Sequence, residues 1–181
     1  PDFSRISISR LTAEGRTNLV DVDLSAALKG DCAKDVPLQW GDVVEIPAYD
    51  HNVNANWNGL PPEMKLSLCR CLARGVSVIV KGEKHEVLLS PGFLSQDEFL
   101  AALGVHDSSH VVVQNFWVRT TLNGANLIRA SSDLKRVKVR RADLATKKTQ
   151  EFLLNEEAGN SNDLWLRDGD VIEVPDKGGA E

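Results

Sequence analysis

Four tryptophans are the residues of this chain best suited to bind a ligand through their side chains. An indole ring offers a flat apolar face, on which the C–H surface of a sugar ring can stack. Trp57 lies in an Asn-rich stretch that predicts an exposed loop, so it is the first candidate for sugar contact. Trp40 and Trp165 flank two predicted turns, where they could bind a ligand or pack against a sheet or a neighbouring subunit. Trp117 stands in an apolar stretch that favours the core.

Two Gly-Asp pairs, Gly41-Asp42 and Gly169-Asp170, each come directly before a predicted strand. Their carboxylates could bind a sugar hydroxyl or a cation. Asp side chains in turns commonly accept hydrogen bonds from backbone amides instead. The repetition favours a shared requirement of the fold, so we interpret Gly41, Asp42, Gly169 and Asp170 as structural turn residues.

A basic cluster lies between positions 135 and 148. Its members are Lys135, Arg136, Lys138, Arg140, Arg141, Lys147 and Lys148. Such a cluster is typical of the solvated face of a hairpin. It could also contact an acidic polysaccharide or an acidic surface of another copy, such as Glu156-Glu157. Arg140 and Arg141 are its candidates for ligand contact.

No motif predicts catalysis, a metal site or a cofactor. His106 and His110 have the spacing of two ligands on one helical turn, but the residues between them predict a loop. Neither a glycine-rich phosphate loop nor a Gly-x-Ser-x-Gly elbow occurs in the sequence. We interpret the cysteines Cys32, Cys69 and Cys71 as buried apolar thiols rather than as redox or metal residues. We therefore expect a protein that is not an enzyme.

The composition limits the classes of partner. A chain of 181 residues suffices for one larger domain or two small ones. The net charge of −5 disfavours non-specific nucleic-acid binding, which requires a basic surface. No apolar run approaches the roughly 18 residues of a membrane span. The start at Pro1 favours a processed or excised fragment, and the absence of a leader is expected either of a cytosolic chain or of one whose targeting segment lies elsewhere.

The spacing of apolar residues predicts the elements that position these side chains. Strands are expected at 6–10, 20–24, 76–80, 85–89, 111–113, 116–118, 137–141, 152–154 and 171–174. Helical spacing predicts a helix over 62–74. The capping box Ser95–Glu98 predicts a second, short helix over 96–103. A helical turn over 25–29 is expected to end at Gly30, and Leu122–Gly124 predicts a hairpin turn.

One pattern of strands occurs twice in the chain. The copies match at their Leu, Gly-Asp, Val, Glu and Pro positions in the last strand, without a gap. The matching segments are 6–10 with 137–141 and 38–47 with 166–175, and 20–24 corresponds loosely to 151–154. Each copy is therefore predicted to contain a strand, a turn, a strand, a loop and a Gly-Asp strand. The hairpin and short helix over 76–104 precede the second copy, which gives the order β-β-α-β-β-β of a β-grasp.

The second copy resembles the soluble ligand-binding β-grasp (SLBB) family. The residues that carry the resemblance are Val80-Lys81-Gly82-Glu83, Ser90-Pro91-Gly92, the helix over 96–103, the strand 137–141 and the segment 166–175. Three features depart from the family pattern. Lys84-His85-Glu86 follows Val80–Glu83, where the family usually has a shorter approach to Pro-Gly. The first copy lacks the opening hairpin and helix, so it is either truncated or completed by residues 62–80. Gly104-Val105 stands where the family has Ala-Gly-Gly.

The resemblance implies an α+β fold of tandem β-grasp (ubiquitin-like) units. Residues 1–60 would form a partial unit with a connector, and residues 61–181 a helix with a complete unit. Such domains are similar to those of outer-membrane polysaccharide export proteins, where tandem copies build the periplasmic part of a ring-shaped channel. The resemblance thus implies a periplasmic or outer-membrane location, a homo-oligomer of the full-length protein, envelope export partners and contact with polysaccharide. The family also includes vitamin B12-binding and respiratory-complex members.

Three functions without catalysis remain open at this point. The first is a module of a polysaccharide export channel that makes subunit contacts and touches the passing glycan. The second is a stand-alone carbohydrate- or small-ligand-binding module, and the third is a protein-interaction scaffold that never binds sugar. Glycan affinity that depends on Trp57 would exclude the third, and a ring-sized assembly would favour the first over the second.

Overall fold

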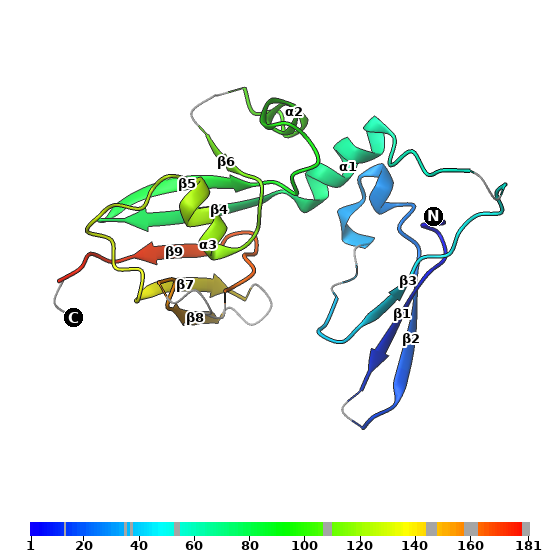
Figure 1. The fold of residues 1–181 in the computed structure, drawn as a ribbon, viewed down its shortest axis with the longest axis horizontal. Coiled ribbons are helices and arrows are strands. Elements are labelled where there is room, and N and C mark those ends of the chain that lie inside the picture. Colours follow the sequence, from blue (N-terminus) through cyan, green and yellow to red (C-terminus); the bar gives the residue numbers. More distant parts are fainter. Residues whose placement is uncertain are drawn as a thin grey trace. The chain divides into compact units, whose positions relative to one another are not determined.

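The computed structural model describes residues 1–12, 14–34, 36, 38–52, 55–106, 110–143, 148–157 and 163–178. These residues form an α+β fold with two sheets and three α-helices (Figure 1). The chain divides into two compact units, Pro1–Cys71 (unit 1) and Leu72–Glu181 (unit 2). Among the helices of the described ranges, none combines the length and the apolar character that a membrane span requires.

Unit 1 contains a three-stranded sheet in the order β2-β1-β3. Its strands are β1 (Ile6–Leu11), β2 (Thr17–Val22) and β3 (Val43–Glu45), and both pairings are antiparallel. The predicted alternation in β1 is confirmed, because Ile6 and Ile8 are buried in a small core with Val22. The 3₁₀ helices η1 (Ala27–Lys29) and η2 (Cys32–Lys34) follow β2, and Gly30 ends η1 in the left-handed conformation, as predicted. The helix α1 (Pro62–Leu72) ends two residues earlier than expected.

Unit 2 is built on a six-stranded sheet in the order β6-β5-β4-β9-β7-β8. Its elements are β4 (Arg74–Val80), β5 (Glu83–Leu89), α2 (Gln96–Ala102), β6 (Val111–Val113), α3 (Val118–Gly124), β7 (Val137–Ala142), β8 (Thr149–Leu154) and β9 (Val171–Val174). β4 and β9 pair in parallel at the centre of the sheet. One core collects the inward side chains of these strands, such as Val78 and Val139, and α3 adds Leu122 to it. The predicted capping box of α2 is present, with Ser95 and Glu98 bonding each other's backbone N–H.

Residues 116–124 differ from the prediction, which placed a strand at 116–118 and a hairpin turn at 122–124. The segment instead leads into the helix α3, and Trp117 keeps only an isolated bridge to Trp165. The Asn115 side chain accepts hydrogen bonds from the N–H groups of Phe116 (2.7 Å) and Trp117 (2.9 Å) just before the helix. Val118 and Leu122, one helical turn apart, are both buried in the core. Burial of this helical face outweighs the β-propensity of the aromatic and branched residues.

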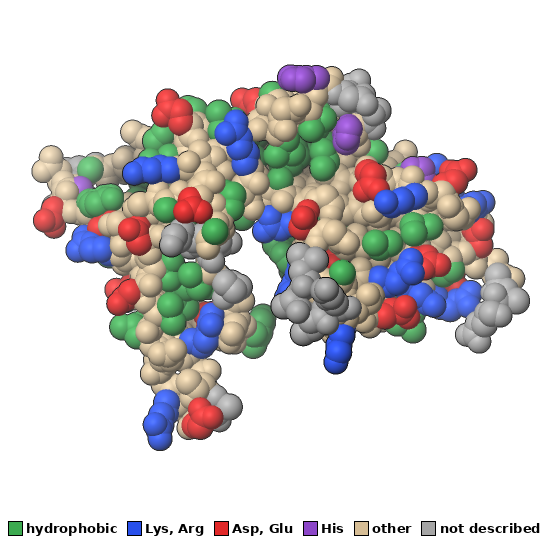
Figure 2. Space-filling model, turned by 180° about the vertical axis from the view of Figure 1, so that it is seen from behind, with side chains coloured by type: hydrophobic (Ala, Val, Ile, Leu, Met, Phe, Trp, Pro, Cys, Tyr) green, Lys and Arg blue, Asp and Glu red, His purple; other side chains and the backbone are tan. Residues whose placement is uncertain are grey.

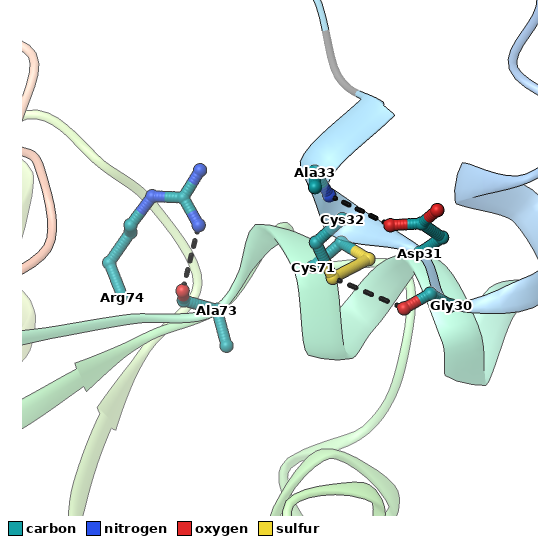
Figure 3. Close-up of a disulfide and its surroundings, with 7 residues drawn as sticks. All are labelled: Gly30, Asp31, Cys32, Ala33, Cys71, Ala73 and Arg74. Atoms are coloured by element: carbon teal, nitrogen blue, oxygen red, sulfur yellow. Dashed lines mark hydrogen bonds between the residues drawn. A yellow bond between two sulfur atoms is a disulfide. The ribbon is translucent and has the colours of Figure 1, made fainter.

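The cysteines also differ from the prediction of three buried thiols. Cys32 of η2 and Cys71 of α1 form a disulfide, with their Cα atoms 5.0 Å apart (Figure 3). Cys69 is free and fully buried, as predicted. Sequence reasoning missed the disulfide because the two partners stand 39 positions apart and only the fold brings them together.

Candidate functional site

The two Gly-Asp turns have the same hydrogen bonds in both units. The Asp42 carboxylate accepts a bond of 2.8 Å from the N–H of Gln39, and the Asp170 carboxylate accepts one of 2.8 Å from the N–H of Arg167. Gly41 and Gly169 have φ angles of +90° and +79°, a conformation that glycine adopts without strain. Both Asp side chains therefore close the turn that begins the last strand of each copy.

Each of these aspartates accepts hydrogen bonds from an arginine in the first strand of its own copy. Arg141 donates from Nε to Asp170 Oδ1 (2.9 Å) and from Nη2 to Asp170 Oδ2 (2.6 Å). Arg10 makes the same two bonds to Asp42, at 2.9 and 2.7 Å. The Asp170 side chain is fully buried, and that of Asp42 is 2% exposed. Paired, two-bond contacts of this kind fix the angle between strands as well as compensating the buried charge.

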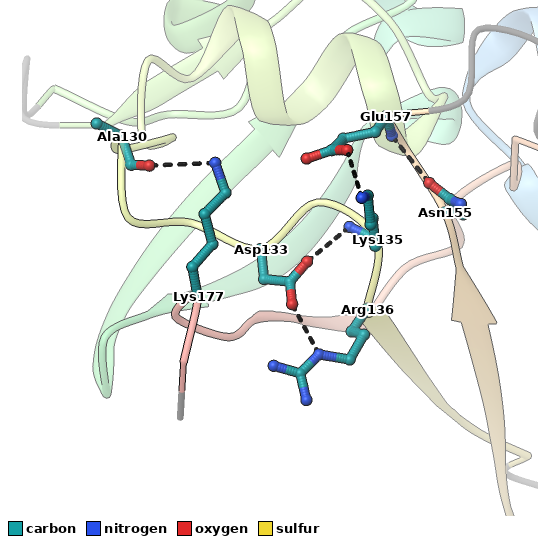
Figure 4. Close-up of polar contacts among 7 residues, drawn as sticks. All are labelled: Ala130, Asp133, Lys135, Arg136, Asn155, Glu157 and Lys177. Carbon is teal, nitrogen blue, oxygen red and sulfur yellow. Dashed lines mark hydrogen bonds and ion pairs between the residues drawn. The ribbon is translucent and has the colours of Figure 1, made fainter. Parts of the chain in front are cut away.

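A second polar pair is duplicated before the first strand of each copy. In unit 2 the Arg136 guanidinium donates to Asp133 (2.7 Å; Figure 4). The Asp133 N–H donates to the Pro175 carbonyl (2.7 Å). In unit 1 Arg5 pairs with Asp2, and the Asp2 N–H donates to the Pro47 carbonyl (2.6 Å). Hydrogen bonds from Ser4 and Arg5 hold the pKa of Asp2 well below its usual range. Sequence analysis missed this pair, although its signal, Asp-x-x-Arg before an alternating strand, occurs at both places.

Strand order and register confirm that the two copies share one arrangement. The order β2-β1-β3 of unit 1 corresponds to β8-β7-β9 in unit 2. Ser7 of β1 stands opposite Glu45 of β3, and Lys138 of β7 stands opposite Glu173 of β9, at the matching positions of the sequence repeat. The repeat seen in the sequence is therefore a repeat of three paired strands with the same hydrogen-bonded register.

The copies differ on the outer side of their last strand. In unit 2, β9 also pairs with β4, whereas within the described residues β3 pairs with β1 alone. Three apolar positions show the consequence: the side chains of Leu166, Ile172 and Val174 are 0–2% exposed, but their equivalents in unit 1 are 40–62% exposed. Those equivalents are Leu38, Val44 and Ile46. Figure 2 shows apolar side chains on the sheet of unit 1, at the lower left. We call Leu38, Trp40, Val44 and Ile46 the β3 surface.

The structure brings two of the four tryptophans together. Trp117 and Trp165 meet edge to face, with ring centroids 5.1 Å apart, and Trp165 stacks on Phe116 at 5.0 Å. Trp117 is 40% exposed, so its prediction as a core residue is wrong, and Trp165 is 49% exposed. We call Trp117 and Trp165 the aromatic pair. In unit 1, Trp40 is fully exposed in its turn, and Trp57 is largely exposed and contacts Phe3 edge to face.

Most members of the basic cluster that the structure describes are paired with carboxylates of unit 2. Lys135 contacts Glu157 (3.4 Å) and Arg140 contacts Glu173 (3.6 Å) at the surface. Arg141 is committed to Asp170, and it also donates to the Trp165 carbonyl (2.8 Å). Lys147 lies outside the described residues. Arg141 therefore serves the fold of unit 2, and Arg140 is the more accessible of the two arginines predicted to contact a ligand.

An arginine of α3 pairs with a buried carboxylate. Arg119 donates to Glu156 Oε2 (2.9 Å), while Glu156 Oε1 is buried and accepts no hydrogen bond from the residues that the structure describes. Burial raises the pKa of Glu156, although Arg119 opposes this shift. The charged form of Glu156 is thus less favourable in the folded protein than in water. We interpret the pair as part of the fold rather than as a site open to ligand.

The described residues hold no group of three or more His, Cys, Asp or Glu side chains that could bind a metal ion. Residues 107–109, which were predicted to form a loop between the two histidines, lie outside the described ranges. A shallow cavity of about 250 Å³ at the end of the β4–β5 hairpin is lined by Val80, Lys81, Glu83, His85, Leu127 and Arg129. Its mixed charges favour no particular ligand class.

Comparisons with known proteins give no assignment for the chain. It matches no family model, and neither curated proteins nor solved structures gave a match. The candidate functional surfaces are therefore the β3 surface of unit 1 and the aromatic pair of unit 2, both defined by geometry.

Proposed function

We propose that this chain is a non-catalytic module of a polysaccharide export assembly in the cell envelope, acting through subunit contacts and contact with glycan. The observation that carries the proposal is the duplication of one three-stranded unit with the same Arg–Asp pair in each copy. Tandem β-grasp units are what the resemblance to the SLBB family implies. Unit 2 contains the elements of the expected order β-β-α-β-β-β, with β6 and α3 inserted after α2, and unit 1 contains the three paired strands of the repeat.

The disulfide supports an envelope location. Disulfides persist in oxidising compartments such as the bacterial periplasm, and they are rare in the reducing cytosol. Cys32–Cys71 is such a bond, and it connects η2 to α1 within unit 1. A periplasmic or outer-membrane location would keep this bond formed.

The aromatic pair is the surface that we propose for glycan contact. Trp117 and Trp165 are each about half exposed, and the Phe116 ring supports Trp165 from one side. Supported, partly exposed indole rings offer apolar area at little cost in conformational entropy. The same observation also favours the second candidate function, a stand-alone carbohydrate-binding module. The third candidate, a protein scaffold, does not require any of these rings to touch sugar.

Titration with a panel of acidic and neutral oligosaccharides, followed by Trp fluorescence, tests glycan contact. We expect a saturable change that is lost in Trp117→Ala and retained in Trp57→Ala, because Trp57 is the matched exposed indole outside the aromatic pair. Loss in Trp57→Ala alone would move the site to unit 1. No change across the panel would remove glycan contact and leave subunit assembly or the scaffold function.

The size of the assembly separates export from a stand-alone module. Mass photometry of the natural polypeptide that contains residues 1–181 should show a closed oligomer if the module belongs to a channel. A monomer that still binds oligosaccharide would instead indicate the stand-alone module.

A further inference from the structure

The β3 surface is the place where the two copies of the repeat are unequal. In unit 2 the outer edge of β9 is covered by β4, which runs parallel to it with Val78 opposite Ile172 and Val80 opposite Val174. In unit 1 the residue equivalent to Ile172 is Val44, and it is 40% exposed. An open strand edge with apolar side chains beside it is a template for pairing with another strand.

In unit 2 the turn before β9 also forms hydrogen bonds with β4. The Ser77 N–H donates to the Asp170 carbonyl (3.0 Å), and the Gly169 N–H donates to the Gly75 carbonyl (2.8 Å). The equivalent groups in unit 1 are the Asp42 carbonyl and the Gly41 N–H. Because β1 already holds β3 in the same register as β7 holds β9, these groups are preset for the same two bonds.

We propose that the β3 surface binds a β-hairpin whose first strand runs parallel to β3, in the register that β4 takes on β9. Binding of a strand to a sheet edge gains affinity from backbone hydrogen bonds and specificity from alternate side chains. The first strand must present apolar side chains at every second position, as Val76, Val78 and Val80 do in β4, to cover Val44 and Ile46. The requirement holds whether or not the chain works in polysaccharide export.

Leu38 shows that the occupant is more than one strand. Its equivalent, Leu166, is fully buried, and the Leu166 N–H donates to the Phe116 carbonyl in the segment between β6 and α3 (2.7 Å). The occupant of unit 1 therefore carries a further segment that reaches Leu38 in the same way.

Trp40 sets the occupant apart from β4 at one position. Its equivalent, Asp168, accepts a hydrogen bond of 2.7 Å from the N–H of Gly75 at the start of β4. An indole ring has no acceptor for that N–H, but it offers a large apolar face. The hairpin that binds unit 1 therefore begins with an apolar contact to Trp40 where β4 begins with a hydrogen bond.

The order of elements in unit 2 indicates where this hairpin comes from. The elements that cover β9 and Leu166, from β4 to the segment before α3, all precede β7 in the chain. By the same order, the hairpin on β3 precedes β1, and we assign it to the same polypeptide. Residues 62–80 do not supply it, because α1 falls in unit 1 as a helix and β4 pairs with β5 and β9.

A chimera tests whether the β3 surface accepts such a hairpin. A second copy of residues 74–131 is placed directly before Pro1 of the whole chain, because Pro1 stands where Ser132 stands in unit 2. We expect amide hydrogen exchange in residues 38–47 to slow by about tenfold or more, as for amides moved from a fraying edge into a paired strand. Binding of a hydrophobic dye should fall in parallel.

The matched control is the same chimera with Val78→Asp in the added copy only, because Val78 is fully buried where β4 meets β9. Exchange in residues 38–47 should then return to the rate of the unmodified chain. Residues 171–174 of the original unit 2 report in both chimeras that the native sheet is intact. If the amides of residues 38–47 exchanged at the same rate in the chimera, its control and the unmodified chain, the proposed docking site would be overturned.

Hydrogen exchange in the natural polypeptide that contains residues 1–181 tests the assigned source. Protection of residues 38–47 in the monomer at low protein concentration would support a hairpin from the same polypeptide. Protection that appears only as oligomers form would overturn that assignment and place the hairpin on a neighbouring molecule. If residues 38–47 exchanged as fast in the natural polypeptide as in residues 1–181 alone, no hairpin would be bound there. That result would overturn both the assigned source and the proposed binding.

Discussion

Arg141 binds Asp170 through two parallel hydrogen bonds, of 2.9 and 2.6 Å, and joins β7 to the turn that begins β9. Arg10 and Asp42 repeat this pair between β1 and the turn before β3. The repeated pair, more than the repeated strand, defines the two copies, because it sets the position of the last strand against the first. The strength of the pair is therefore the first property to test.

Loss of the Arg141 side chain should destabilise unit 2 strongly. Arg141→Met leaves the fully buried Asp170 carboxylate without its partner, and breaking a buried pair in this way costs about 3–5 kcal/mol. Arg140→Met, one residue away, removes only a contact between half-exposed side chains, which is worth about 0–1 kcal/mol. Denaturant unfolding of the two variants measures both changes. Equal losses in the free energy of unfolding would contradict a special role for the buried pair.

The Arg10–Asp42 pair predicts acid sensitivity of unit 1. The Arg10 guanidinium and the Gln39 N–H lower the pKa of Asp42 from 3.8 to about 2. A lowered pKa in the folded state gives stability that is fully present above pH 3.8 and is lost as the pH falls towards 2. Asp42→Asn should therefore lose stability at pH 5 and show a flatter pH dependence between pH 4 and pH 2.

Urea unfolding of wild type and Asp42→Asn across this range, followed by a signal from unit 1, checks the prediction. The difference between the two proteins isolates Asp42 from other acids of unit 1, such as Asp2 and Asp23, whose pKa values are also lowered. If the difference in the free energy of unfolding between the two proteins stayed constant from pH 5 to pH 2, the acid sensitivity would not be due to Asp42.

Local patterns in the sequence predicted most strands and α2, because each of these elements depends on neighbouring residues. A comparison of distant segments predicted the repeat. Ile6 and Ile8 alternate as a half-buried strand must, and Ser95 and Glu98 cap a helix wherever it packs. The α3 segment could not be predicted in this way, because its apolar run suits either a strand or a helix until the core selects one face. Burial of Val118 and Leu122 makes that selection.

Long-range pairs were among the features that sequence analysis missed. Arg10 and Asp42 stand 32 positions apart, and Arg141 and Asp170 stand 29 apart. Nothing in a strand pattern says which cation meets which carboxylate, although all four residues recur together in the repeat. The exposure of Leu38 and Val44 could not be predicted from the sequence either, because their equivalents in unit 2 have the same apolar character and are buried.

The disulfide predicts both a thiol count and a loss of stability on reduction. Alkylation of the denatured chain without reductant should label one cysteine, Cys69, and alkylation after reduction should label all three. Reduction should destabilise unit 1 by about 2–4 kcal/mol, because Cys32–Cys71 constrains the unfolded chain across 39 positions. The unfolding of unit 2 serves as the control and should not change. Labelling of three cysteines in the denatured chain before reduction would contradict the disulfide.

The substitution Glu156→Gln should stabilise the protein at neutral pH. Burial raises the pKa of Glu156, so the folded state favours the protonated carboxyl. The stability due to that preference is fully present below the unfolded pKa of about 4.5 and is lost as the pH rises through the higher folded pKa. Glu156→Gln resembles the protonated form and keeps an oxygen towards Arg119. It should therefore raise the melting temperature at pH 7, and the gain should vanish below pH 4.

Two further variants make the Glu156 experiment decisive. Glu157→Gln changes the neighbouring, partly exposed carboxylate that contacts Lys135, and it should have little effect at either pH. Arg119→Met leaves the Glu156 charge without its partner, so it should destabilise the protein at pH 7 and less so at pH 4. A Glu156→Gln protein that melts earlier than wild type at pH 7 would show that the ion pair with Arg119 outweighs the cost of burying the carboxylate.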